Sequence, residues 1–127
     1  MTDIKLNFIH VCDQVLVSSD GKVSIIGIFS EIKAIKFPAL HPNFSVISNI
    51  EGKEGEYDQT IELLDSSGKK MAAVSGKSEI KKDGSKNNFV ANFVNIVFPE
   101  EGKYKIISRI NDEILNKDDE TIILVKR

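Results

Sequence analysis

The stretch IKLNFIHVCDQVLVSSDGKVSIIGIF, residues 4–29, decides the fold class. Its first half alternates polar and apolar side chains, which is typical of a β-strand with one buried face. The residues expected on that face are Ile4, Leu6, Phe8, His10 and Cys12. Asp20-Gly21 then interrupts the pattern, and this pair tolerates the positive φ angles of a tight hairpin turn. A second apolar run over 23–29 completes the prediction of a β-hairpin.

The second arm of this hairpin is apolar on both faces. Val23, Ile25 and Phe29 lie on one face of the expected strand, whereas Ile26 and Ile28 lie on the other. A sandwich normally leaves one face of each sheet in water, so this strand is expected to be central or to be covered by another element. The cover can come from a loop of the chain itself or from a second subunit, most simply by two-fold symmetry. The pattern therefore favours a homo-oligomer with Ile26 and Ile28 in its interface.

The remaining strands are expected where similar runs are separated by turn residues. They cover residues 44–50, 57–65, 70–80, 89–98, 103–110, 113–116 and 121–126. The apolar phase slips within 89–98, which predicts a β-bulge near Phe93. Residues 31–36 fit either a strand or a single helical turn, and two prolines within 37–42 indicate a loop.

The composition agrees with a β-rich chain. Ile and Val together number 28, against 12 for Leu and Ala, and β-branched residues favour strands. A length of 127 residues fits one domain. The sequence therefore predicts an all-β fold: a single antiparallel β-sandwich domain over residues 1–127, immunoglobulin-like or jelly-roll-like, with about nine short strands.

The charge balance disfavours two classes of partner. The chain has 17 basic and 19 acidic residues, a net charge of −2, and only two of its basic residues are Arg. Nucleic-acid binding depends on cationic contacts to phosphate, and binding to a membrane surface depends on similar basic clusters. We expect neither partner. A lone cysteine cannot form an internal disulfide, so a reducing, cytoplasmic location is expected.

Metal and catalytic sites are weakly indicated. His10, Cys12 and His41 could hold a metal or supply an enzyme's nucleophile and base, but satisfied core residues are the simpler interpretation. The acidic segment 116–120 could bind calcium, although its spacing matches no EF-hand and solvated turns have the same composition. We therefore expect no metal, no cofactor and no catalytic residue.

Two further segments are candidate contact sites. The loop 37–42 offers Phe37, Leu40 and His41, which either plug one end of the sandwich or contact a ligand or subunit. A basic stretch follows an acidic one in the middle of the chain, so opposite charges are expected to face each other across a hairpin. Three lysines in the basic stretch could instead meet an anion: Lys81, Lys82 and Lys86.

Several short motifs carry a resemblance. They are Cys12-Asp13, Gly21-Lys22, Ile26-Gly27-Ile28-Phe29, Phe37-Pro38-Ala39-Leu40-His41-Pro42, Gly55-Glu56 and Phe98-Pro99-Glu100-Glu101-Gly102-Lys103-Tyr104. Together they resemble an uncharacterised bacterial family of small domains, a domain of unknown function, over most of the chain. The resemblance implies a compact β-rich domain of bacteria or their mobile elements and assigns no activity.

A second resemblance concerns architecture alone. Gly102-x-Tyr104 is similar to the tyrosine corner of immunoglobulin-like sandwiches, although the paired cysteines and the tryptophan of antibody domains are missing. The function expected from all these features is a non-enzymatic binding or assembly module with an unknown partner. The alternatives are a small-molecule-binding protein that sequesters or senses a metabolite, and an enzyme that uses His10, Cys12 or His41.

Overall fold

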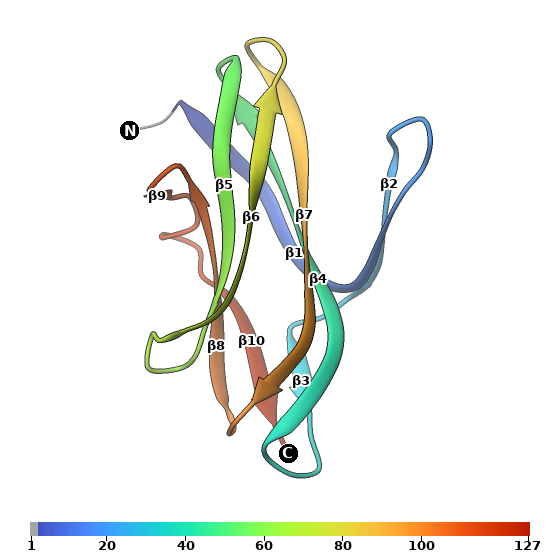
Figure 1. The fold of residues 1–127 in the computed structure, drawn as a ribbon, viewed down its shortest axis with the longest axis vertical. Helices are drawn as coiled ribbons and strands as arrows, with labels where there is room; N and C mark the ends of the chain where they lie inside the picture. Colours follow the sequence, from blue (N-terminus) through green and yellow to red (C-terminus); the bar gives the residue numbers. More distant parts are fainter. Residues whose placement is uncertain (1–2) are drawn as a thin grey trace.

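The computed structural model describes residues 3–127, which form ten strands in two packed sheets (Figure 1). The strands are β1 (Ile4–Val17), β2 (Val23–Ile28), β3 (Glu31–Lys33), β4 (Ala39–Gly52), β5 (Gly55–Leu64), β6 (Lys70–Ile80), β7 (Ser85–Phe98), β8 (Gly102–Ile110), β9 (Glu113–Ile114) and β10 (Thr121–Lys126). No helix occurs in this range, so the prediction of an all-β sandwich is confirmed. Residues 31–33 adopt the strand alternative.

The two sheets differ in size and connection. The four-stranded sheet has the order β2-β1-β4-β7, and the six-stranded sheet has the order β3-β10-β8-β5-β6 with β9 paired to β8. All pairs are antiparallel except β3 with β10, which is parallel. The hairpin of β1 and β2 extends away from the body of the sandwich (Figure 1). Strand β2 is an edge strand, so the expectation that it is central is wrong, whereas cover by a second subunit stays a prediction.

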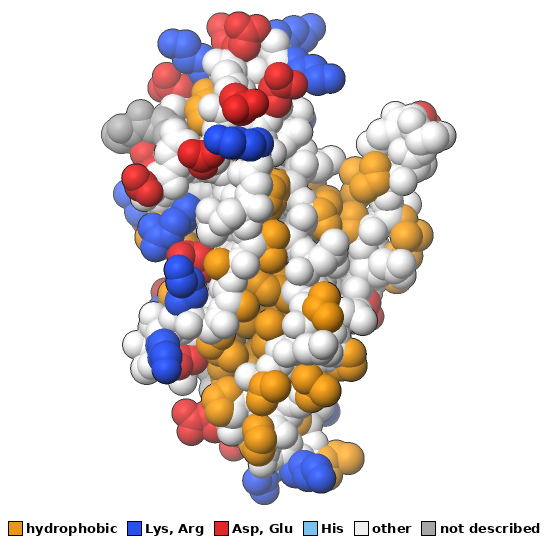
Figure 2. Space-filling model, in the orientation of Figure 1, with side chains coloured by type: hydrophobic (Ala, Val, Ile, Leu, Met, Phe, Trp, Pro, Cys, Tyr) orange, Lys and Arg blue, Asp and Glu red, His pale blue; other side chains and the backbone are white. Residues whose placement is uncertain are grey.

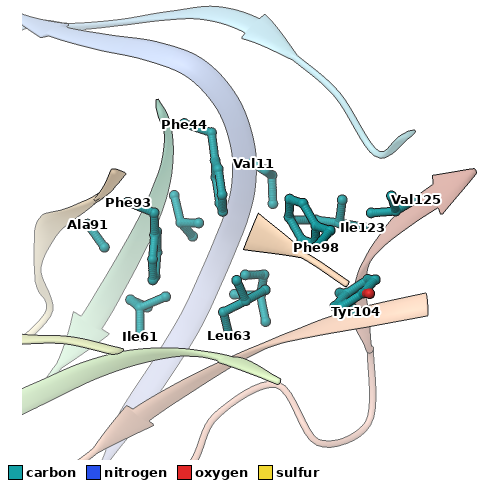
Figure 3. Close-up of a cluster of buried hydrophobic side chains, with 12 residues drawn as sticks. Val11, Phe44, Ile61, Leu63, Ala91, Phe93, Phe98, Tyr104, Ile123 and Val125 are labelled. Carbon is teal, nitrogen blue, oxygen red and sulfur yellow. The ribbon is translucent and has the colours of Figure 1, made fainter. Parts of the chain in front are cut away.

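The core consists of two apolar clusters with a polar layer between them. The larger cluster joins the sheets through side chains such as Phe44, Phe93 and Tyr104 (Figure 3). The smaller one contains the following residues: Ile4, Ile50, Ile80 and Ile110. Between them, buried Gln59 donates from Nε2 to Ser48 Oγ at 2.9 Å and accepts from Ser78 Oγ at 2.5 Å. The core is thus a stack of apolar, polar and apolar layers along the sandwich.

The tyrosine corner is present. The hydroxyl of Tyr104 donates to the backbone carbonyl of Glu100 at 2.6 Å, and the ring packs edge-on against Phe98. This bond anchors the turn between β7 and β8 to the core, as in immunoglobulin-like sandwiches.

A bulge in β1 shows that the prediction of one shared face for residues 4–12 is wrong. The register between β1 and β4 shifts between Leu6 and Phe8, so Asn7 is an extra residue. One extra residue reverses the two faces of a strand. Ile4 and Leu6 consequently pack on the smaller cluster, whereas Phe8, His10 and Cys12 lie on the opposite face of the sheet.

Strand β4 begins earlier than expected. It already pairs with β7 at Ala39, so residues 39–42 are strand although a loop was predicted. Pro42 fits there because β1 pairs with β4 only as far as Ser45, which leaves this part of β4 with one neighbour. Asn95, at a φ of 53°, lies opposite Pro42. The register between β4 and β7 has no shift, so the β-bulge predicted near Phe93 is absent; the change of apolar phase is at Asn95, whose φ is positive.

Candidate functional site

The central part of the outer face of the four-stranded sheet, the side that points away from the core, is uncharged; Lys5, Glu51 and Lys86 lie at one end of the same face. We call this central part the uncharged face, and 14 residues of the four strands lie on it. They are Phe8, His10 and Cys12 of β1, Ile28 of β2, Leu40, Asn43, Ser45, Ile47 and Asn49 of β4, and Asn88, Val90, Asn92, Val94 and Val97 of β7. None is Lys, Arg, Asp or Glu, and four of them are buried: Cys12, Ser45, Ile47 and Asn49.

Amide side chains cross this face as a hydrogen-bonded row. Asn7 Nδ2 donates to Asn49 Oδ1 at 2.8 Å, and Asn49 Nδ2 donates to Asn88 Oδ1 at 2.7 Å. Further along the same strands, Ser45 Oγ donates to Asn92 Oδ1 at 2.6 Å. These five polar side chains thus bond to one another without a charged partner.

Apolar side chains are exposed beside this row. Ile28 is 58% exposed, Leu40 61% and Val94 62%, while Ile26 on the projecting hairpin is 45% exposed. Figure 2 shows hydrophobic side chains running down the middle of the molecule and onto the hairpin. Exposed apolar groups that gather on one surface indicate contact with another molecule.

The outer face of the six-stranded sheet is different, because it carries paired charges. Arg109 Nε lies 2.8 Å from Glu62 Oε1, and Lys70 Nζ lies 3.7 Å from the other oxygen of Glu62. Asp58 pairs with Lys77 across β5 and β6, as the charge pattern of the sequence predicted. This face has the character of a solvated surface, so the two sides of the sandwich are chemically unlike.

The loop residues predicted as a contact site are separated by the structure. Leu40 is exposed on the uncharged face, together with Ile28. Phe37 instead packs against the larger core cluster, and the Arg127 guanidinium lies 5.8 Å from the centre of its ring. The His41 ring packs at 5.8 Å from the Phe44 ring, near the core.

The three candidate lysines lie among acids rather than in a basic patch. Lys81 and Lys82 flank the β6–β7 turn beside Asp83, whose carboxylate accepts a hydrogen bond from the backbone amide of Glu54 at 2.8 Å. Lys86 is opposite Glu51 in the sheet. The charged end of the molecule is mixed in sign (Figure 2).

Cys12 is fully buried on the uncharged face. Its Sγ lies 3.6 Å from the backbone carbonyl oxygen of Ser45, to which the thiol donates. Burial raises the pKa of the Cys12 thiol, and the nearby carboxylate of Asp13 raises it further. A protonated, inaccessible thiol is a poor nucleophile. Within residues 3–127, His, Cys, Asp and Glu form no group of three that could hold a metal ion.

A groove of about 1100 Å³ lies along the other half of β1. Its walls are β1 from Ile4 to Val11, the segment 28–30 and the segment 113–122. Asn116 fixes the last of these walls, because its buried amide donates to the carbonyl of Ile106 and accepts from the amide of Ser108. Sequence reasoning missed this groove; the only signal is that the first hairpin arm is longer than the second.

Comparisons with known proteins concern family and fold. The model of a family of unknown function, DUF6941, matches residues 7–119. An immunoglobulin-like protein from Pseudomonas aeruginosa is similar in structure, with a TM-score of 0.50 and 17% identity over 98% of this chain and 97% of that one. A Bifidobacterium dentium β-glucuronidase complexed with coumarin-3-O-glucuronide matches with a TM-score of 0.45 and 14% identity, over 89% of this chain. The chain spans 16% of that enzyme's length. No curated protein matches the sequence.

The described residues contain no helix that is long and apolar enough to span a membrane.

Proposed function

Because the chain belongs to DUF6941, a family of unknown function, we propose its role from its geometry: a non-enzymatic assembly module that joins a second copy of itself through the uncharged face. The observation that carries this proposal is the contrast between the two sides of the sandwich. Paired charges cover the six-stranded sheet, whereas the 14 positions of the uncharged face hold none.

A second copy fits this face better than a charged partner does. A charge buried against apolar side chains without a counter-charge is strongly destabilising. Two uncharged faces bring no such charge together, and the Asn and Ser side chains offer both donors and acceptors. A two-fold axis places the same patch on both partners, so a surface of this kind complements itself.

The size of the face sets the expected strength of the dimer. Four strands about 4.8 Å apart and about eight residues long give a footprint of roughly 20 by 27 Å. That is about 540 Å², below the roughly 800 Å² that each partner of a standard stable interface contributes. The exposed aliphatic side chains of the β1–β2 hairpin, such as Ile26, supply the remaining area. We therefore expect a dimer of moderate affinity that dissociates on dilution.

The test is sedimentation velocity over a dilution series, with Ile28→Lys and Val94→Lys as probes. Both side chains are exposed on the uncharged face, so neither substitution disturbs the core. We expect a concentration-dependent dimer in the wild type and a monomer in both variants. Lys103→Glu, on the six-stranded sheet, is the control and is expected to remain dimeric. A wild type of monomer mass at every concentration would contradict the proposal.

The alternative is a small-molecule-binding protein, and the groove beside β1 favours it. A volume of about 1100 Å³ is large enough for a small ligand. Native mass spectrometry of protein purified from its own host separates the two roles, because it reports subunit number and retained ligand together. A monomer that carries a stoichiometric small molecule would support the alternative.

A further inference from the structure

We propose that the open edge of β1 binds an extended basic peptide segment, which adds as a further strand to the four-stranded sheet. The groove shares Phe8, His10 and Ile28 with the rim of the uncharged face, but the strand-addition contacts lie on the backbone edge of β1 and do not require a dimer. Strand addition uses backbone hydrogen bonds for affinity and alternate side chains for specificity.

The edge exists because β2 is shorter than β1. Strand β1 has 14 residues and β2 has six. The paired positions on β1 run from Cys12 to Val17, and one further bond joins the amide of Phe29 to the carbonyl of Val11. On that side, no strand of the described chain pairs with residues 4–10, whereas β4 pairs with their other side.

The backbone of Ile9 is the central unpaired group. The carbonyl of Val11 points toward the β2 side, and in an antiparallel strand the residue two positions away points the same way. The amide and carbonyl of Ile9 therefore point into the groove. An exposed row of such groups is a template for another strand.

The groove has the shape and the walls that an added strand needs. It follows β1 over the seven residues Ile4–His10, enough for a peptide of about six to eight residues. Its apolar side chains come from both core clusters: Leu6 and Leu115 from the smaller, and Ile9 and Phe29 from the larger. Alternate apolar side chains of a bound peptide would contact these groups.

Two exposed carboxylates of the groove, Asp118 and Asp119, favour a basic peptide. Its lining has four acidic side chains, Glu113, Asp118, Asp119 and Glu120, and two basic ones, Lys5 and Lys117. Glu120 pairs with Lys105 at 3.0 Å. Asp118 and Asp119 are exposed and have no ion pair among the described residues, so they are available to Lys or Arg of a ligand.

The experiment selects from random eight-residue peptides displayed on phage, with the whole protein as bait and Ile9→Pro as the counter-selection. Proline removes the amide that points into the groove and leaves the β4 ladder intact. We expect enriched peptides with apolar residues at alternate positions and Lys or Arg between them. As synthetic peptides they should bind the wild type at least about tenfold more tightly than they bind Ile9→Pro or Asp118→Asn/Asp119→Asn.

Two controls separate strand addition from loss of folding. Ile9→Ala removes the same packing but keeps the amide, and it should bind within about threefold of the wild type. N-methylation of the peptide on the edge that faces β1 should abolish binding, whereas N-methylation on the opposite edge should not. Failure to enrich any peptide, enrichment of acidic peptides, or equal binding to Ile9→Pro and Ile9→Ala would each overturn the proposal. None of these results affects the dimer, which sedimentation tests separately.

Discussion

Gln59 connects the two halves of the core through the hydroxyl groups of Ser48 and Ser78. Replacement by Leu removes both hydrogen bonds and leaves two buried hydroxyls without a partner. Each unsatisfied group costs about 1–3 kcal/mol, so we expect Gln59→Leu to lower the free energy of unfolding by about 2–4 kcal/mol in urea denaturation.

Ser108 provides the matched comparison. It is equally buried in the polar layer, but its hydroxyl has no hydrogen-bond partner in the described part of the chain. Ser108→Ala should therefore leave the free energy of unfolding unchanged or raise it by up to about 1 kcal/mol. A loss larger than that would show that a buried water or another group satisfies this hydroxyl.

The hydroxyl of Tyr104 gives the protein an alkaline limit. Burial raises the pKa of this phenol, and the negative charges of Glu100 and Asp65 raise it further. A group with a raised pKa binds its proton more tightly when folded, so its stabilising effect is complete below the unfolded pKa of about 10. That effect is lost as the pH rises through the folded pKa.

Two measurements test this expected loss of stability at high pH. The free energy of unfolding should decrease above about pH 10, and Tyr104→Phe should flatten that decrease. At neutral pH, Tyr104→Phe should cost about 1–2 kcal/mol, because the bond to the Glu100 carbonyl is lost. An unchanged alkaline slope in Tyr104→Phe would assign the decrease to other groups.

At the scale of the elements, Gly27 lets β2 adopt a positive φ where it passes close to Asp13 of β1. Its φ is +70°, and a Cβ at this position would lie 2.3 Å from Asp13 Oδ2. Gly27→Ala should therefore lower stability by about 1–2 kcal/mol, measured as a lower Tm. Gly21→Ala is the control: its φ is +86° with no atom near the added Cβ, so it carries the backbone cost alone. Equal losses at both positions would exclude a role for Asp13.

The strands were predictable because alternation and turn residues are local signals. Strand β6 was predicted with its exact bounds, and the Asp-Gly hairpins were found where expected. The bulge at Asn7 was not predictable, because it depends on which residues of β4 lie opposite β1. The loop predicted around Pro42 was wrong for the same reason. A proline interrupts a strand only where a neighbouring strand would accept a hydrogen bond from its amide.

The candidate sites also divide into those with a local sequence signal and those that depend on long-range strand pairing. Exposure of Ile26 and Ile28 was signalled by a strand that is apolar on both faces, and the structure leaves both in solvent. The uncharged face could not be assembled from the sequence, because its residues come from four strands whose register is set by long-range pairing. The groove beside β1 depends on a pairing that ends halfway along a strand, which no local pattern records.

For the whole molecule, salt should weaken the proposed peptide complex and leave the proposed dimer nearly unchanged. Exposed ion pairs are screened at high ionic strength, whereas contacts between uncharged surfaces are not. Between about 0.05 M and about 1 M NaCl, the dimer dissociation constant should stay within about threefold, and basic peptides should bind about tenfold more weakly. Sedimentation and fluorescence anisotropy measure the two effects on the same sample. A dimer that dissociates in high salt would mean that its interface includes charged groups.

The arrangement of the first and last strands also decides how the fold carries tension. Strand β1 starts at one end of the long axis, and β10 finishes at the other (Figure 1). A force applied to Ile4 and Lys126 would run along both strands and load the hydrogen bonds of β1 with β4 and of β10 with β8 in shear. Many bonds then resist together instead of opening one after another. We therefore expect the folded domain to resist a pull on its two ends more strongly than a pull that separates one strand from its neighbour at a time.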